Sequence, residues 1–309
     1  MFDKPKACIN IDFVIPVKCN NFMIRSVIEG IQLFYKPRFI YVISNIHEIE
    51  KIKINYKNWL CETENIIFYS EETFFEKKYH LSREMIEKYY TCIDENSREF
   101  GWWYQQLLKL GSLYQIKGIS DPYIVWDSDL VSIKKWEIYP TDLSSENFKF
   151  AVLQENAKNE WNREEYARSA WELLGLKAVE PEDGGTFVPH HFVFHHEVIH
   201  KFLDHITNDD KSCNWITRIM ELSQQFYRFS EYKCIATFMI NYFPHLFSYH
   251  PFEKYGKQGI RYRDWKEIVP FIKSQINIDE SGLSFKDFCD FVNKNFVDYP
   301  SYIQIEHIY

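Results

Sequence analysis

Short apolar runs alternate with amphipathic stretches over the first 70 residues. Residues 9–17, 39–44 and 65–69 are rich in β-branched and aromatic side chains, which predicts three buried strands. Apolar positions recur with helical spacing over 22–34 and 46–60, which predicts a helix in each connection. The resulting β-α-β-α-β order is typical of an α/β protein with a central, mostly parallel sheet flanked by helices.

The remaining two thirds of the chain predict further helices and short strands. A long helix is expected over 100–116, where Asp121-Pro122 follows, and a fourth buried strand over 123–126. The pattern also predicts strands at 148–154, 192–194 and 246–250, helices at 161–174, 197–206, 215–227 and 231–242, and two helices in the tail from 265 onward.

Composition and charge exclude several classes of protein. Hydrophobic residues make up 46% and charged residues 26%, so the chain is not disordered, and an aromatic content of 18% supplies stacking surface for flat ligands. A net charge of −8 argues against a general nucleic-acid binder. The 7 cysteines form no CxxC pair, and the chain shows neither a signal-peptide pattern nor a membrane-spanning run. We therefore expect free thiols and a cytoplasmic protein without a transmembrane segment.

Two carboxylates follow the fourth predicted strand. Asp127 and Asp129 stand at i and i+2 of an Asp-Ser-Asp turn, after Tyr-Ile-Val-Trp. Ligands of open α/β sheets bind at the carboxyl ends of strands, and two carboxylates there can hold a hard cation such as Mn²⁺ or Mg²⁺. Asp and Ser are also ordinary turn residues, so a solvated turn is the alternative.

One face of the helix at 100–116 mixes aromatic, amide and cationic side chains. Trp102, Gln105, Gln106 and Lys109 stand at i, i+3, i+4 and i+7. Buried amides need hydrogen-bond partners, which a ligand in a cleft would supply. The alternative is an amphipathic helix whose polar side faces water.

A histidine-rich segment supports a rival function. His196, Glu197 and His200 form an H-E-x-x-H string, which on a helix binds zinc and supplies a general base, with Glu221 as a third ligand. A zinc metallopeptidase is therefore the main alternative. However, the string begins where a strand is expected to end, and a peptidase would leave Asp127 and Asp129 unexplained.

Three motifs in this order resemble a known family. They are Phe13-Val14-Ile15-Pro16-Val17-Lys18, the helix Gly101 to Leu110, and Ile124-Val125-Trp126-Asp127-Ser128-Asp129, with Ser230-Glu231-Tyr232 later in the chain. Together they resemble nucleotide-sugar glycosyltransferases of the GT-A fold, specifically the DUF6492-like group of bacteria and large algal viruses. The resemblance spans roughly residues 9 to 250. It implies one GT-A (Rossmann-like) domain with a nucleotide-binding half (1–130), an acceptor-side half (131–255) and a helical tail (256–309).

The resemblance also implies an activity. The expected enzyme is a metal-dependent, inverting glycosyltransferase that moves a sugar from a nucleoside-diphosphate sugar, with UDP as the expected nucleotide, to a hydroxyl group of a glycan or glycoprotein. A sugar-binding protein without turnover is the other alternative. Glu231 follows a good N-cap, Ser230, and is the expected general base, with Asp183 as its substitute.

The remaining site residues are implied in the same way. Those expected at the donor are Val17, Lys18, Asn45, Tyr104, Gln105, Lys109, Trp126, Asp127 and Ser128. Asp127, Asp129 and His250 are the expected metal ligands, with His245 as the alternative histidine, and His190 and His191 are expected on the acceptor side.

Overall fold

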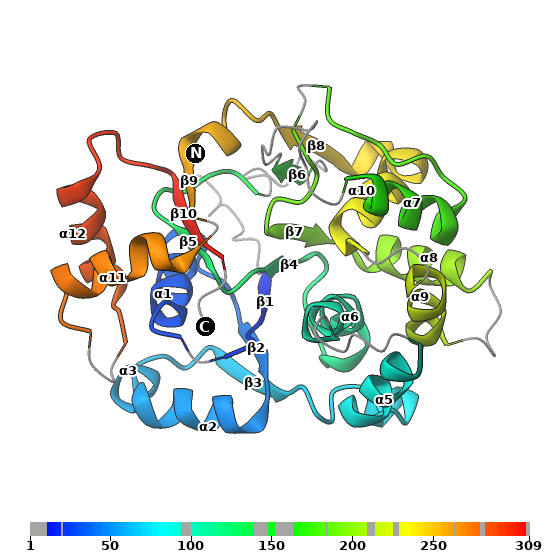
Figure 1. Ribbon diagram of the computed structural model, residues 1–309, viewed down its shortest axis with the longest axis horizontal. Helices are drawn as coiled ribbons and strands as arrows, with labels where there is room; N and C mark the ends of the chain where they lie inside the picture. The colour runs from blue at the N-terminus through cyan, green and yellow to red at the C-terminus, as the bar shows by residue number, and fades with distance from the viewer. Residues whose placement is uncertain are drawn as a thin grey trace, which may run out of the picture. The chain divides into compact units, whose positions relative to one another are not determined.

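The computed structural model shows a mixed α/β protein (Figure 1). It describes residues 11–19, 21–93, 100–138, 148–151, 163–182, 185–208, 214–224, 229–262, 264–278 and 282–306. Among these residues, no helix combines the length and the apolar character that crossing a bilayer requires.

A five-stranded sheet has the order β3-β2-β1-β4-β7. Its strands are β1 (Asp12–Pro16), β2 (Ile40–Ser44), β3 (Ile66–Ser70), β4 (Tyr123–Trp126) and β7 (His191–Phe194). The pairs β1/β2 and β2/β3 are parallel, with Ile15 opposite Val42 and Val42 opposite Phe68. Every residue of β1, β2, β4 and β7 is buried. The predicted α/β class and the opening β-α-β-α-β order are confirmed.

Helices connect and flank these strands. Between β1 and β4 they are α1 (Ile24–Tyr35), α2 (Ile46–Asn55), α3 (Lys57–Cys61), α4 (Glu76–Tyr79), α5 (Arg83–Ile93) and α6 (Phe100–Gln115). The single helix predicted over 46–60 is wrong in one respect, because it breaks at Tyr56. The Tyr56 side chain is buried, its hydroxyl donates to the carbonyl of Asn21, and its ring contacts Trp59 edge-on. This tertiary anchor outweighs the local helical pattern.

The chain divides into two compact units. The first consists of residues 1–12, 118–124 and 137–256, and the second of 13–117, 125–136 and 257–309. The single-domain division predicted above stays a prediction.

The first unit is mainly helical. It contains α7 (Arg163–Leu174), α8 (His196–Ile206), α9 (Trp215–Gln224) and α10 (Glu231–Tyr242), with the short 3-10 helix η2 (Pro244–Leu246). A parallel pair, β6 (Phe148–Ala151) and β8 (Phe247–His250), places Ala151 opposite His250. Serine at the N-cap of α10 accepts a hydrogen bond from the backbone of Lys233, as the sequence predicted.

The second unit includes the C-terminal tail. Helices α11 (Trp265–Gln275) and α12 (Phe285–Asn295) confirm the two helices predicted there, and α12 packs beside α1 (Figure 1). The tail is not purely helical, however. It adds β9 (Gly259–Tyr262), after the 3-10 helix η3 (Gly256–Gln258), and β10 (Tyr302–Ile305), which form the sheet β5-β10-β9 with β5 (Leu130–Ser132). Strands of three or four residues carry too little periodicity to be predicted.

Candidate functional site

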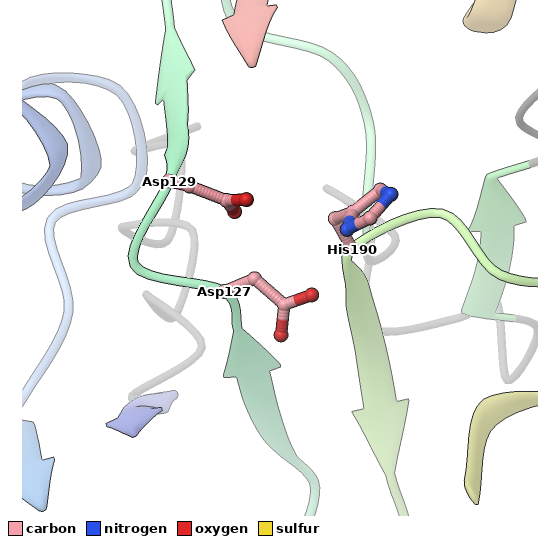
Figure 2. Close-up of side chains that lie close together, drawn as sticks. All are labelled: Asp127, Asp129 and His190. Carbon is pink, nitrogen blue, oxygen red and sulfur yellow. The ribbon is translucent and has the colours of Figure 1, made fainter. Parts of the chain in front are cut away.

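The turn that carries Asp127 and Asp129 is fixed on both sides by buried residues. The amide of Leu130 donates to the carbonyl of Asp127 over 3.2 Å, which closes the turn. The Trp126 indole donates to the carbonyl of Leu130 over 2.9 Å and stacks on Trp136 with ring centroids 5.5 Å apart. Asp127, Ser128 and Asp129 are half-exposed, and both carboxylates project to the same side of the turn (Figure 2). This arrangement can present two carboxylates to one ligand.

Asp129 is held by the C-terminal strand. The amide of Ile305 donates to the Asp129 carbonyl over 3.2 Å, and Gln304 Nε2 lies 3.4 Å from Asp129 Oδ2. Gln304 is fully buried, and β10 pairs antiparallel with β5 so that Gln304 lies opposite Leu130. Sequence reasoning missed Gln304. The available signal was a single polar side chain inside the apolar run Tyr-Ile-Gln-Ile.

Asp127 has a different partner. Lys109 Nζ lies 2.6 Å from Asp127 Oδ1, and the lysine side chain is 3% exposed against 18% for the aspartate. Lys109 belongs to α6, between the buried residues Leu108 and Leu110. Its expected place at the donor stays a prediction, and the structure shows a direct ion pair between Lys109 and one of the predicted metal ligands.

The carboxyl ends of β1 and β2 carry three of the expected donor residues. Val17 is buried, and its backbone carbonyl accepts the Ser44 hydroxyl over 2.7 Å. Lys18 follows and is exposed. The Asn45 side chain accepts the backbone N–H of Glu48 over 2.9 Å, so its oxygen serves as the N-cap of α2. Because β1 and β2 are parallel, these residues share one edge of the sheet.

Two further donor candidates lie on α6. Tyr104 is buried, and its hydroxyl donates to the Glu71 carbonyl over 2.6 Å. Burial raises the pKa of the Tyr104 phenol far above its ordinary range, so the hydroxyl stays protonated. Gln105 is half-exposed. Of the two, Gln105 therefore retains the more accessible side chain.

An acidic pair at the end of β3 was not predicted. Burial raises the pKa of Glu71 to about 7, although Arg83, with Nε 3.1 Å from Glu71 Oε1, opposes that shift. The Arg83 guanidinium lies 5.2 Å from the ring centroid of Phe100. Glu72 accepts the amide of Ile46 at the start of α2 and the Ser70 hydroxyl. Glutamates in a charged, aromatic stretch gave no sequence signal that separated them from surface residues.

The histidine-rich segment has mainly structural roles in its own unit. The His196 amide donates to Asp121 Oδ1 over 3.0 Å, and its ring Nε2 lies 2.9 Å from the Ser120 carbonyl. Burial lowers the pKa of the neighbouring His195 to about 4, and His200 is exposed. Among the residues that the structure describes, His196, Glu197 and His200 do not form a group that could hold a metal ion.

The two histidines expected on the acceptor side differ. His190 directly precedes β7, is half-exposed and has a backbone φ of 62°. His191 is 2% exposed, with Nδ1 3.1 Å from the Pro189 carbonyl and its ring against Tyr255. His190 is therefore the one of the pair with an accessible imidazole.

The catalytic candidates also lie in the first unit. Glu231 occupies the first turn of α10 and is 3% exposed. Lys233 is fully buried and pairs with Glu180 over 2.6 Å. Asp183, the expected substitute base, lies outside the described residues.

The late histidines differ in their surroundings. The His250 ring nitrogen Nε2 contacts the Glu137 carbonyl. His245 is exposed.

A comparison with known protein families identifies the family of this chain. The profile of a family described as a family of unknown function, DUF6492, matches residues 10–258. The chain belongs to the DUF6492 family. The match includes the Asp127-Ser128-Asp129 turn and Glu231 and ends before Gln304. The resemblance to the DUF6492 group drawn from the sequence is confirmed. No curated protein matches the chain.

Solved structures resemble this DUF6492 protein only distantly. Mouse xyloside xylosyltransferase 1, in its apo form, is 10% identical with a TM-score of 0.46 and covers 96% of this chain and 97% of its own. The galactosyltransferase LgtC, in complex with donor and acceptor sugar analogues, is 9% identical with a TM-score of 0.42, covering 96% and 88%. At these values the likeness establishes no property of the present chain.

Proposed function

We propose that this DUF6492 protein is a metal-dependent, inverting glycosyltransferase of the GT-A type. It transfers a sugar from a nucleoside-diphosphate sugar, with UDP as the first nucleotide to test, to a hydroxyl group of a glycan acceptor. The observation that carries the proposal is the pair of carboxylates on one side of the turn after β4. Asp127 and Asp129 follow a fully buried strand and are held by separate partners, which is more organisation than a solvated turn requires.

The donor atoms suit a divalent cation. Asp127 and Asp129 offer their carboxylates on the same side of the turn (Figure 2). Two carboxylates fit hard divalent cations such as Mn²⁺ and Mg²⁺. When bound, such an ion stabilises negative charge on a diphosphate leaving group.

The chain's own residues have distinct roles in this proposal. Asp127 and Asp129 bind the ion and so orient the diphosphate. Gln105 lies on α6, and Lys18 and Asn45 follow β1 and β2 at the carboxyl edge of the sheet. In the proposal, these three residues contact the nucleotide or the sugar. Glu231 accepts the proton of the acceptor hydroxyl as its oxygen attacks the anomeric carbon. In the proposal the new bond forms on the face of the anomeric carbon away from the diphosphate, whose bond to that carbon breaks in the same step, so the configuration inverts.

A thermal-shift screen tests this function. Nucleoside-diphosphate sugars and UDP are added with and without Mn²⁺, and the unfolding temperature is followed, because a ligand stabilises the state that binds it. We expect at least one nucleotide to raise the unfolding temperature only when Mn²⁺ is present. If none does at millimolar concentration, the chain is not a nucleotide-sugar transferase.

Metal analysis separates the proposal from a zinc peptidase. We expect no tightly held zinc, because the H-E-x-x-H string starts α8 with His196 bound to backbone and to Asp121. One zinc per chain, lost in His196→Gln, would contradict the proposal.

A further inference from the structure

Lys109 is a buried cation in direct contact with a proposed metal ligand. It is 2% exposed, and its ammonium lies 2.6 Å from Asp127 Oδ1. Its neighbours in α6, Leu108 and Leu110, are 1% and 0% exposed, so the lysine stem lies in the core. A buried ammonium that loses its carboxylate partner is strongly destabilising. Asp127 and Lys109 therefore form a stable ion pair in the protein without ligand.

This ion pair changes how a divalent cation can bind. An ion at Asp127 shares a carboxylate with Lys109 or displaces it, and in both cases two positive charges come close together in a region with little water. Asp129 Oδ2, by comparison, lies 3.4 Å from the neutral amide nitrogen of Gln304. Binding of the ion alone is therefore opposed at one of the two aspartates.

A diphosphate removes that opposition. Its negative charge compensates the ion and the Lys109 ammonium together, so each ligand makes binding of the other more favourable. We propose that Lys109 couples the metal to the diphosphate, and that the site takes a divalent cation and a nucleoside diphosphate as a cooperative pair. The inference rests on the proposed function for the identity of the anion. Lys109 is in this respect a positioning residue.

Two variants isolate the contribution of Lys109. Lys109→Met keeps most of the buried stem and removes the charge, whereas Lys109→Arg keeps the charge. Lys233→Met is the matched control, because Lys233 is also a buried lysine with a glutamate 2.6 Å away, in the other compact unit. Far-ultraviolet circular dichroism establishes that each variant is folded.

The measurement is the affinity for Mn²⁺, by electron paramagnetic resonance, without and with saturating UDP. In the parent protein we expect UDP to tighten Mn²⁺ binding by about tenfold or more. In Lys109→Met, Mn²⁺ alone should bind about tenfold more tightly than in the parent, and the effect of UDP should largely vanish. Lys109→Arg should retain the coupling, and Lys233→Met should leave the Mn²⁺ affinity unchanged.

Several results would overturn the inference. One is a folded Lys109→Met variant with the Mn²⁺ affinity and UDP effect of the parent, and another is an equal change in Lys233→Met. If Lys109→Met does not fold, the parent protein still decides, because equal Mn²⁺ affinity of the parent with and without bound UDP contradicts the coupling. The arm with Mn²⁺ alone contains no nucleotide. Failure of the proposed function, in which the parent binds Mn²⁺ but no UDP, is therefore distinguishable from failure of the Lys109 inference.

Discussion

At the scale of the residue, Glu231 combines a structural and a proposed catalytic position. It stands in the first turn of α10, directly after the Ser230 N-cap, where the helix dipole favours a carboxylate. Its low exposure shows that the carboxylate lies in a protected environment, so an acceptor must reach it from a restricted direction. The N-cap role explains Ser230 without any part in catalysis. The proposed role of Glu231 as general base is tested by replacing its side chain.

Replacing Glu231 with Gln should separate binding from chemistry. The amide keeps the shape of the side chain but cannot accept the proton, so turnover should fall by about 10² to 10⁴. Affinity for the donor should be unchanged, since Glu231 contacts the acceptor hydroxyl in the proposal. NMR of the parent's product should show an inverted anomeric centre. Retained configuration, or full activity of Glu231→Gln, would rule out Glu231 as the base of a single displacement.

Glu71 gives a pH dependence with a defined sign. Its pKa is raised by burial from 4.5 to about 7 in the folded protein. Between these values the folded state binds a proton that the unfolded state has already released, so the contribution of Glu71 to the free energy of unfolding falls as pH rises.

Glu71→Gln should remove this dependence. Urea unfolding at several pH values from about 5 to 8 should show the parent losing stability relative to the variant by up to about 1.4 kcal/mol per pH unit. A difference that stays constant or grows with pH would mean that the ion pair with Arg83 dominates over burial.

At the scale of the element, β9 and β10 connect the tail to the site. They pair in parallel, with Gly259 opposite Tyr302, and β10 delivers Gln304 to Asp129. A Cβ built on Gly259 would lie 1.9 Å from Cζ of the Tyr302 ring, so the strand pair requires glycine at this position. Tyr302 is itself buried against Trp136.

Gly259→Ala should therefore destabilise the protein by about 1–3 kcal/mol, as overpacking does in other cores. Gly101→Ala is the control, because nothing lies within 4 Å of a Cβ at that exposed position in α6. The control should keep or slightly increase stability, since alanine favours helix over glycine. Equal free energies of unfolding for the two variants in urea would contradict the close packing of β9 on β10.

At the scale of the whole molecule, the predictable part of the structure is its local part. Buried parallel strands are short apolar runs, so the order of the strands up to β4 followed from the sequence. The Asp-Ser-Asp turn was recognisable because it directly follows such a strand. Helix α10 and its Ser230 N-cap were also recognisable, because a helix cap depends only on neighbouring residues in the sequence.

The partners of the site residues were not predictable, because they come from distant parts of the chain. The helical spacing of Lys109 relative to Trp102 and Gln105 indicated a shared helix face that could meet a ligand. Nothing in this spacing indicated Asp127 as the partner of Lys109. Gln304 is 175 residues from Asp129 and belongs to a strand too short to be recognised. The contact of His250 Nε2 with the Glu137 carbonyl, 113 residues away, is another partner that the sequence did not indicate.

The central claim is that Asp127 and Asp129 bind a nucleoside diphosphate through a divalent cation. Isothermal titration of UDP into the parent, Asp127→Asn and Asp129→Asn, each with Mn²⁺ and with EDTA, tests it most directly. Asp204→Asn, a change at an exposed position of α8, is the matched control. We predict Mn²⁺-dependent binding in the parent and in Asp204→Asn, and a loss of at least about 100-fold in affinity in both site variants while the fold is retained. Binding of UDP by the site variants with the affinity of the parent, or by the parent equally well in EDTA, would contradict the account.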